Sequence, residues 1–235
     1  MKDMPCNLES CFLCGHCIAD WKLVIGLKKK TFFFKKGGSI FKQGEPVQGI
    51  FFMYKGTAKV SETWGGQKEL ILRFARPGDV LGYRGFGGDL NYPISASALE
   101  DSEVCFIDNG LLETILQTNP SFTYQLMKVY SSELQKAEKR MRDLVHRDVK
   151  GRISLALLEI EDVFGHNPDG FISLPLTRQD IASFAGTTYE TIFKFFIELS
   201  DQNILVTAGK SIKINDRKGL EAFINGEAGH KNSTK

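Results

Sequence analysis

The chain has 235 residues, of which 42% are hydrophobic and 25% charged, and its formal net charge is +2. These values are typical of two modest domains, and so small a charge decides nothing about nucleic acid as a partner, because basic residues can cluster locally. No apolar run approaches the roughly 20 residues of a membrane span and no signal peptide opens the chain, so we expect a cytoplasmic protein without a membrane partner.

Four of the five cysteines fall within the first 20 residues, with the spacing C-x4-C-x2-C-x2-C. In a cytoplasmic protein such a group indicates metal binding or redox chemistry rather than disulfide bonds. Two CxxC steps let three thiolates converge on one soft metal centre from a compact loop, and a zinc ion bound by all four thiolates is the alternative. A c-type haem site is excluded, because Ile18 stands where a histidine ligand would follow Cys17. The four residues are Cys6, Cys11, Cys14 and Cys17.

Between about residues 28 and 108 the sequence changes to short apolar runs separated by glycine-containing turns. Around eight such runs predict an antiparallel jelly roll. A metal-dependent barrel enzyme is not expected, because it would need several histidines or carboxylates on inward-facing strands, and every histidine lies outside this segment. The expected strands are 31–34, 39–41, 50–54, 57–61, 69–74, 80–82, 95–99 and 104–107.

A long helix is expected from residue 120 to about 149. Six of its apolar residues recur in alternating steps of three and four, as in the seam of a two-stranded coiled coil, and charged residues flank them. This pattern favours homodimerisation, and the alternative is an amphipathic helix that lies on its own barrel. Asp148 is assigned to the next seam position, and Gly151 to a hinge before a helix that begins at Arg152. The six seam residues are Met127, Tyr130, Leu134, Ala137, Met141 and Leu144.

Residues 177–214 predict a winged helix-turn-helix. Thr177 and Asp180 have the spacing of a capping box at a helix N-terminus, and Gly186 permits a tight turn because glycine adopts positive φ at little cost. Thr187 and Thr188 offer hydroxyl caps for the second helix, which would lie in a DNA major groove. The alternative is that these elements merely pack together. The apolar face of the second helix comprises Ile192, Phe195, Phe196 and Leu199. The two wing strands are expected at 204–207 and 211–214.

Together these elements predict an α+β fold in which four segments follow one another. A short helix at 219–224 and a polar tail are expected to close the chain. The segments are a cysteine-rich stretch at 1–20, an antiparallel β jelly roll at 21–119, a dimerisation helix at 120–150 and a winged helix-turn-helix at 151–235.

The order of these elements and a set of local motifs resemble the Crp/Fnr superfamily of bacterial transcription regulators. The resemblance covers almost everything from Gly37 onward, and the reader-helix motif Gly186-x-Thr188-x-Glu190-Thr191 is its strongest part. It implies a sequence-specific DNA-binding regulator that is not an enzyme, a homodimer on palindromic double-stranded DNA, and RNA polymerase as a further partner. The other motifs are Phe41-x-x-Gly44-Glu45, Gly56-x-x-Lys59-Val60, Pro77-Gly78-Asp79-x-x-Gly82, Asp148-Val149-x-Gly151-Arg152-Ile153 and Thr177-Arg178-Gln179-Asp180-Ile181-Ala182.

The resemblance also implies the DNA contacts, because similar members read bases through a glutamate and an arginine four residues apart. Glu190 keeps the first role and can accept a hydrogen bond from a cytosine N4 amino group, whereas Lys194 stands at the arginine position. Phe193 occupies a position that is usually small, and either packs against a thymine methyl group or enlarges the core beside Phe196. The expected base contacts are Glu190, Lys194, Tyr189 and Phe193, and the expected phosphate contacts are Arg178, Gln179, Thr188 and Thr191.

A cyclic nucleotide is not expected as the ligand of the jelly roll. Members that bind one carry a Gly-Glu pair after the Pro-Gly-Asp turn and an Arg-Ser pair in the next strand. Here Gly82 is followed by Tyr83, and the later segment reads Tyr92-Pro93-Ile94-Ser95. Neither the carboxylate nor the phosphate-binding arginine is present.

Members that resemble the oxygen sensor Fnr hold a [4Fe–4S] cluster with three N-terminal cysteines and one barrel cysteine, in a strand ending Val-Cys-x-Ile. Val104-Cys105-Phe106-Ile107 matches that strand, whereas the N-terminal spacing is more compact and leaves one spare cysteine. The resemblance implies a regulator that responds to redox, oxygen or nitric oxide. A structural zinc ion, thiol redox chemistry and another small ligand in the barrel are the alternatives. The implied iron–sulfur ligands are Cys11, Cys14, Cys17 and Cys105, with Cys6 as an alternative ligand.

Overall fold

The computed structural model describes residues 11–65, 68–86 and 89–226, and these form two compact units divided between Gln135 and Lys136. We call them the N-terminal and the C-terminal unit. Antiparallel sheets with packed helices in the first, and a helix-turn-helix with a hairpin in the second, confirm the α+β class expected from the sequence.

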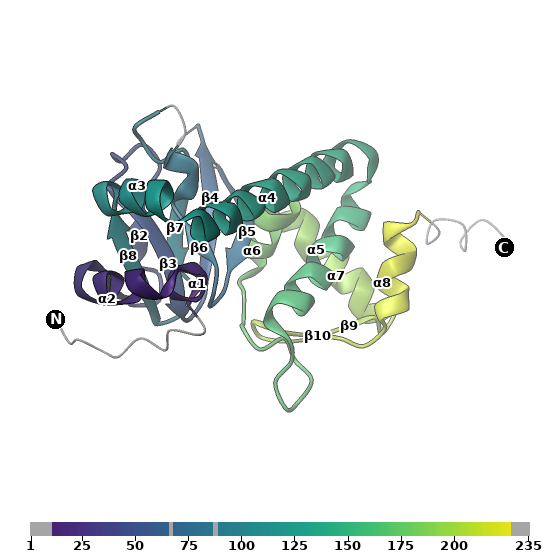
Figure 1. Cartoon of the computed structure of the whole chain (residues 1–235). Coiled ribbons are helices and arrows are strands. Elements are labelled where there is room, and N and C mark those ends of the chain that lie inside the picture. The colour runs from purple at the N-terminus through teal and green to yellow at the C-terminus, as the bar shows by residue number, and fades with distance from the viewer. Residues whose placement is uncertain (1–10, 66–67, 87–88, 227–235) are drawn as a thin grey trace, which may run out of the picture. The chain divides into compact units, whose positions relative to one another are not determined.

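The N-terminal unit is built on two four-stranded antiparallel sheets, with the strand orders β1-β8-β3-β6 and β2-β7-β4-β5 (Figure 1). All eight expected strands are present, with end shifts of up to three residues, and the jelly roll is confirmed. Glycines with positive φ occupy its tight turns, among them Gly37, Gly44 and Gly78. The strands are β1 Lys30–Phe34, β2 Ser39–Phe41, β3 Gly49–Lys55, β4 Ala58–Trp64, β5 Lys68–Ala75, β6 Val80–Leu81, β7 Ser95–Ala98 and β8 Ser102–Asp108.

Side chains of β3 and β8 alternate between two separate cores, because successive residues of a strand point to opposite faces. Val104 and Phe106 join the core inside the roll, where Phe51 and Met53 of the neighbouring strand also lie. Cys105 points the other way, into a second core between this sheet and the helices. The strand register therefore places the only described cysteine of the roll on its helix-covered face.

Four helices contribute to this second core: α1 Phe12–His16, α2 Ala19–Lys28, α3 Asn109–Thr118 and the first part of α4 Pro120–His146. The expectation of a compact loop without a core pattern around the N-terminal cysteines is wrong for residues 11–17, because Leu13 and Cys14 are fully buried there. A helix of five residues is too short to show a periodic pattern, and its cysteines act as small apolar residues.

The chain between α4 and the next helix, α5 Val149–Phe164, differs from expectation in two respects. Asp148 is not a seam residue but the N-cap of α5, since its carboxylate accepts a hydrogen bond from the N–H of Gly151 at 2.7 Å. Gly151 lies inside α5 rather than at a hinge, and a Cβ there would stand 3.0 Å from the carbonyl oxygen of Phe223. Close packing explains this glycine.

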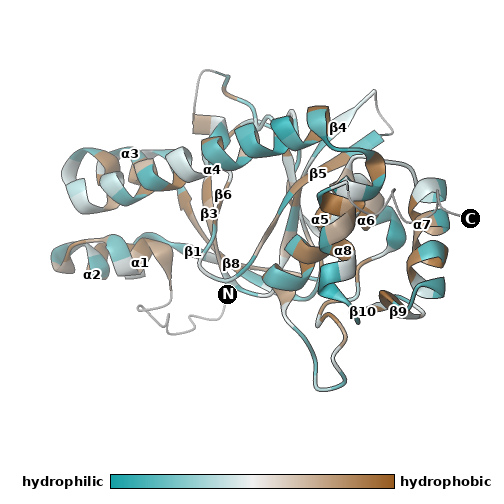
Figure 2. Ribbon diagram, turned by 90° about the vertical axis from the view of Figure 1, so that its right-hand side faces the viewer, coloured by the Kyte–Doolittle hydropathy of each residue, from teal (hydrophilic) through white to brown (hydrophobic). Residues whose placement is uncertain are grey.

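The C-terminal unit contains the expected winged helix-turn-helix. Its helices α6 and α7 are followed by a two-stranded antiparallel hairpin and a final helix, α8, that packs on α5. Apolar residues of α6 and α7 form its core, and the apolar segments of these helices are brown in Figure 2. The elements are α6 Arg178–Ala185, α7 Tyr189–Asp201, β9 Leu205–Ala208, β10 Ser211–Ile214 and α8 Arg217–Ile224.

Candidate nucleic-acid interface and thiol site

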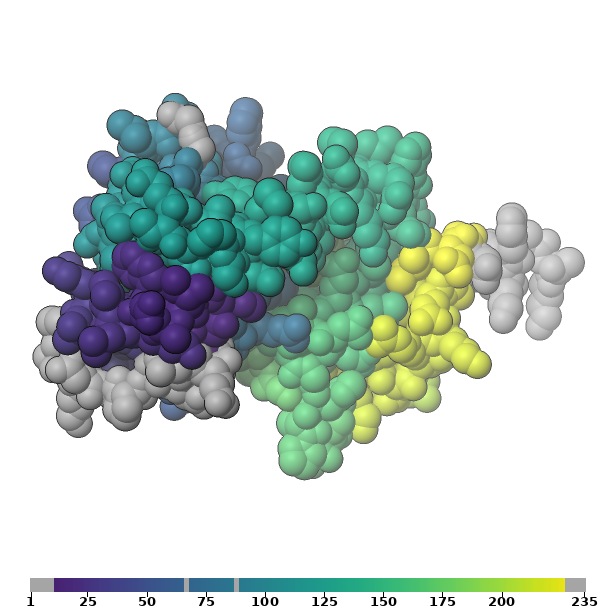
Figure 3. Space-filling view, viewed as in Figure 1, coloured from purple at the N-terminus to yellow at the C-terminus, as the bar shows by residue number. Residues whose placement is uncertain are grey.

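Four cysteines of the N-terminal unit meet in one buried core, and we call them the thiol site: Cys11, Cys14, Cys17 and Cys105. The first is the N-cap of α1, the second lies within that helix and the third is its C-cap, so the three cysteines follow one another at intervals of three residues along one short helix. β8 supplies the fourth thiol. Cys6 lies outside the described residues. Figure 3 shows the N-terminal helices, in purple, against the teal residues of α3 and α4.

The thiols differ in their affinity for a proton. Hydrogen bonds from the Cys105 and Cys14 thiols stabilise the Cys11 thiolate and lower the pKa of Cys11 to about 2. Burial, and next the negative charge of Cys11, raise the pKa of Cys17 to about 12. The shifts of Cys11 and Cys17 thus have opposite signs. Within the described ranges, no three His, Cys, Asp or Glu side chains are arranged as a ready metal-binding group.

The thiol site is packed directly against the start of α4. The ring of Phe12, next to Cys11, lies 5.8 Å from that of Phe122 on α4 in an edge-to-face contact, and 6.2 Å from that of Phe52 on β3. Leu126 of α4 is buried in the same core. Any shift of α1 relative to β8 therefore changes what the first turns of α4 pack on.

A second contact joins the roll to α4. Glu133 lies between Arg73 and Tyr83, with Nε of Arg73 3.3 Å from its Oε2. Tyr83, which follows Gly82 after the Pro-Gly-Asp turn, is buried. Tyr92 is buried inside the roll, where its ring stacks on Phe41 at 4.4 Å and its hydroxyl donates to the carbonyl oxygen of Gly49 at 2.8 Å. Buried aromatic side chains thus lie both just after β6 and just before β7.

Five of the six seam residues of α4 lie outside the buried core, and the sixth, Tyr130, packs edge-to-face on Tyr83 and donates to its carbonyl oxygen. Met127, Leu134 and Met141 are each about 60% exposed, and the other three are also solvent-accessible. Phe122 and Leu126 face the core instead. This apolar stripe remains available for a second copy of the chain, as the heptad spacing suggests.

The helix-turn-helix is fixed by its caps and by two arginines. Thr177 and Asp180 form the expected capping box, and Gly186 ends α6 with φ of 65°. A guanidinium from α4, that of Arg140, donates to the carbonyl oxygen of Phe184 and lies over its ring, and burial lowers the pKa of this arginine. Arg152 donates to the carbonyl oxygen of Gly186 at 3.4 Å. The orphan carbonyls at the end of α6 are satisfied in this way, which sets the direction of α7.

The expected base-reading residues are all exposed on α7. Glu190 lies at its first turn, where its own backbone N–H and the Thr188 hydroxyl lower the pKa of the carboxyl, with a further contribution from Lys194. The carboxylate is thus an acceptor at neutral pH. Phe193 is 45% exposed, so the alternative that it enlarges the core beside Phe196 is not what the structure shows.

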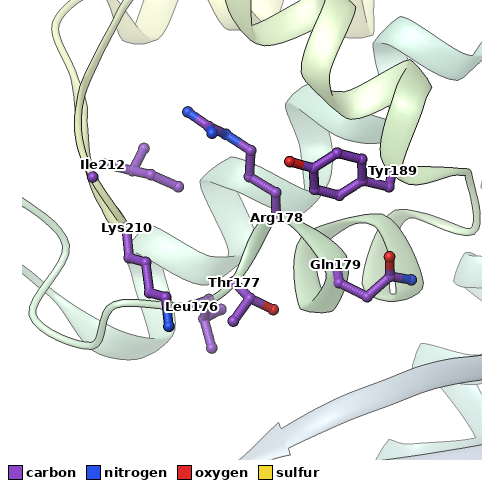
Figure 4. Close-up of a pocket in the computed structure, with 8 residues that line it drawn as sticks. Leu176, Thr177, Arg178, Gln179, Tyr189, Lys210 and Ile212 are labelled. Carbon is purple, nitrogen blue, oxygen red and sulfur yellow. The ribbon is translucent and has the colours of Figure 1, made fainter.

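The expected phosphate-contacting residues surround the N-termini of α6 and α7. Thr188 caps α7 and its hydroxyl lies 3.1 Å from that of Thr191, while Arg178 and Gln179 line a pocket of about 230 Å³ with Tyr189 (Figure 4). Lys210 of the wing lines the same pocket. This residue was not among the expected DNA contacts. Only the fold of the hairpin brings this cation beside α6, although a lysine in the wing turn was a signal that could have been used.

A winged helix-turn-helix that follows a jelly roll is the element order expected of a DNA-binding regulator. A model of the cyclic nucleotide-binding domain matches residues 31–119, and a model of the Crp-like helix-turn-helix domain matches residues 151–223. The chain belongs to the Crp/Fnr family. It is therefore a DNA-binding transcription regulator and not an enzyme, in a family whose members act as dimers.

Individual relatives agree with this assignment. The transcriptional activator protein FnrA of Stutzerimonas stutzeri is 27% identical over 229 residues, which are 94% of this chain and 93% of FnrA. The electron transport regulator A of Shewanella oneidensis is 30% identical over 190 residues, 79% of this chain and 75% of that protein. The structure of FixK2 from Bradyrhizobium japonicum is similar with a TM-score of 0.72 at 24% identity, over 83% of this chain and 96% of FixK2. Each helix in the described ranges is too short or too polar to span a bilayer.

Proposed function

We propose that this regulator binds DNA in response to redox, oxygen or nitric oxide, through a [4Fe–4S] cluster held by Cys11, Cys14, Cys17 and Cys105. The observation that carries the proposal is the meeting of four buried thiols, three from α1 and its caps and one from β8, in the core that also holds the start of α4. The names of the relatives FnrA and electron transport regulator A favour a redox-linked role. Cys6 is the alternative ligand.

The donor set fits such a group. Four thiolates are the usual shell of an iron–sulfur cluster, and the Cys11 thiolate is already stabilised by its neighbours. A bound cluster would supply a centre whose integrity depends on redox conditions. Because the pKa of Cys17 is raised, this residue must lose its proton on binding, which makes assembly sensitive to pH.

The chain's own residues can carry the response to α4. With its thiols tied to Cys105, α1 is held against β8, and Phe12 supports Phe122 of α4. Once that tie is lost, α1 keeps only its apolar packing, and the first turns of α4 lose a fixed neighbour. The pairing of the seam with a second copy then weakens, and with it the binding of a two-fold symmetric site.

The same proposal includes the partners. A dimer paired along Met127 to Leu144 would present two α7 helices to a palindromic duplex, and RNA polymerase would be a further partner in a cytoplasmic setting. Glu190 and Lys194 would face base edges, while the hydroxyls and cations around the pocket would hold phosphates. We assign residues 1–20, 21–119, 120–150 and 151–235 to cluster binding, sensing, dimerisation and DNA reading.

We further propose that the roll takes no cyclic nucleotide. The support is the burial of Tyr83 and Tyr92 where a carboxylate and an arginine would be required. Another small ligand of the roll is the alternative, and titration of the purified protein with candidate ligands tests it.

A structural zinc ion or thiol redox chemistry is the second candidate, and the direct contacts of Cys11 with Cys105 and Cys14 favour it, because neighbouring thiols can oxidise to a disulfide. Protein purified without oxygen should be brown, absorb broadly at about 400 nm and contain iron and sulfide in equal amounts. Its affinity for a selected duplex should fall after exposure to air or nitric oxide. A colourless protein with one zinc ion, or with none and an air-formed disulfide, contradicts the iron–sulfur assignment.

A further inference from the structure

Helix α7 carries an apolar stripe that its own core does not need. Tyr189, Phe193 and Ile197 are 43%, 45% and 49% exposed and recur every four residues, so they lie on one face of the helix. The core side of α7 is filled separately, by four buried residues: Ile192, Phe195, Phe196 and Leu199. Single exposed apolar residues are common, but three in a row on the face of a reader helix require a partner.

The ring of Phe193 is held in place without being covered. The ring of Tyr189 is stacked on it, with centroids 6.4 Å apart and planes 18° from parallel. The guanidinium of Arg178, at the start of α6, lies 5.9 Å from the centroid of Phe193 and 5.7 Å from that of the buried Phe196. These contacts limit the motion of Phe193, so an apolar surface of defined position is offered beside Glu190.

The chemistry of the major groove limits what this surface can contact. Among the groups on base edges there, the C5-methyl of thymine is the apolar one, and the rest are hydrogen-bond donors and acceptors. Residues three apart on a helix are neighbours, so Phe193 and Glu190 would face adjacent base pairs. Lys194, at the next position, supplies only a flexible point charge. The ring of Phe193 is therefore the group of fixed shape on this part of the helix.

We infer that Phe193, held by Tyr189 and Arg178, determines specificity by contacting the C5-methyl group of a thymine next to the base that Glu190 contacts. This inference rests on the proposed function, because it requires α7 to lie in the major groove. Tyr189 and Phe193 would then supply the sequence discrimination. An arginine at the position of Lys194 would otherwise do so.

The test removes one methyl group at a time. A palindromic duplex is first selected with the wild-type protein, and each thymine in a half-site is then replaced by deoxyuridine, which lacks only the C5-methyl. Replacement at one position should weaken binding about fourfold, the effect of one buried methyl group, and about sixteenfold when both half-sites are changed. Replacement elsewhere should leave the dissociation constant unchanged.

Two variants connect the methyl effect to the ring. Phe193→Ala should bind the thymine and deoxyuridine duplexes equally, and Phe193→Leu, which keeps an apolar side chain, should retain part of the difference. Ile197→Ala is the matched control, since it truncates the same stripe farther from the N-terminal end of α7 and should keep the full difference. Dimer mass and circular dichroism confirm that each variant is folded.

Two results overturn the inference. In the first, every deoxyuridine replacement in the selected duplex changes the affinity of wild type and of Phe193→Ala by the same factor. The ring then contacts no methyl group, while the proposed regulator function stands. A wild-type protein that selects no duplex at all would overturn the inference together with the proposed reading of DNA by α7.

Discussion

The hydroxyl of Tyr83, just after strand β6 of the roll, donates a hydrogen bond at 3.2 Å to Oε2 of Glu133 on helix α4. Arg73 approaches the same oxygen, and both charged side chains are less than one-fifth exposed. One carboxylate thus joins two parts of the N-terminal unit that lie far apart in the sequence. The pair is only partly accessible to water, so removal of the carboxylate takes away one of the two acidic partners of Arg73 at a poorly solvated position.

The first prediction follows from that contact. Glu133→Ala should lower the free energy of unfolding by roughly 1–3 kcal/mol, because Arg73 and the Tyr83 hydroxyl lose their shared acceptor. Urea denaturation measures the change. Glu138→Ala, at an exposed position of the same helix, is the control and should stay within about 0.5 kcal/mol of wild type. Equal stability of both variants would show that the carboxylate is not a structural link.

The second prediction concerns the thiol site. Cys105→Ala should lower the iron content and weaken DNA binding together, because β8 then supplies no thiolate to hold α1. Iron analysis and a binding titration on the same anaerobic preparation check both effects. Cys6→Ala is the matched control and should keep both properties if Cys11, Cys14 and Cys17 are the N-terminal ligands. Full iron loading of Cys105→Ala would contradict the assignment of this residue.

The third prediction tests the seam. Met141→Glu places a charge within the expected dimer contact, where the cost of desolvation is large, and should give a monomer that no longer binds its palindrome specifically. Sedimentation velocity reports the mass. Glu138→Lys changes an exposed charge beside the seam and should remain dimeric. A dimeric Met141→Glu protein would place the interface on another surface.

The fourth prediction separates base reading from phosphate binding. Glu190→Ala should cost roughly 1–3 kcal/mol on the selected palindrome and relax the preference at one symmetric base pair. Gln179→Ala should instead weaken binding to all sequences alike, since phosphate contacts carry no base information. A randomised-duplex selection with each variant distinguishes these effects. Unchanged affinity and preference in Glu190→Ala would contradict its role in reading.

The fifth prediction concerns alkaline pH. Burial raises the pKa of Tyr83, Tyr92 and Tyr130 above the value of about 10 for a tyrosine in an unfolded chain. The unfolded chain therefore releases these protons first, so their contribution to stability is complete below pH of about 10 and falls as the pH rises through the folded pKa values. Urea denaturation at rising pH should show that the free energy of unfolding falls less steeply for Tyr92→Phe than for wild type. The exposed Tyr124→Phe should behave as wild type does.

Features of the fold that depend on residues close together in the sequence could be predicted, whereas contacts between distant residues could not. The eight strands and the capped reader helices depend on local patterns, such as Thr177 with Asp180, and these were found. The helix around Cys14 was missed because it is short and most of the buried residues between 11 and 17 are cysteines, and α3 gave no pattern that was assigned. The contacts of Glu133 with Arg73 and of Lys210 with the α6 pocket arise only when distant segments meet, so spacing along the chain does not reveal them.

Burial of the thiol site also determines its reactivity in the metal-free protein. Only 2% of the surface of Cys11 is exposed, so a reagent such as iodoacetamide reaches this residue when α1 separates from the sheet, which also removes the hydrogen bond from Cys105. The labelling rate of a Cys6→Ala protein thus depends on the equilibrium of that local opening as well as on the reactivity of the opened thiol. Alkylation kinetics can in this way report how readily helix α1 separates from the sheet.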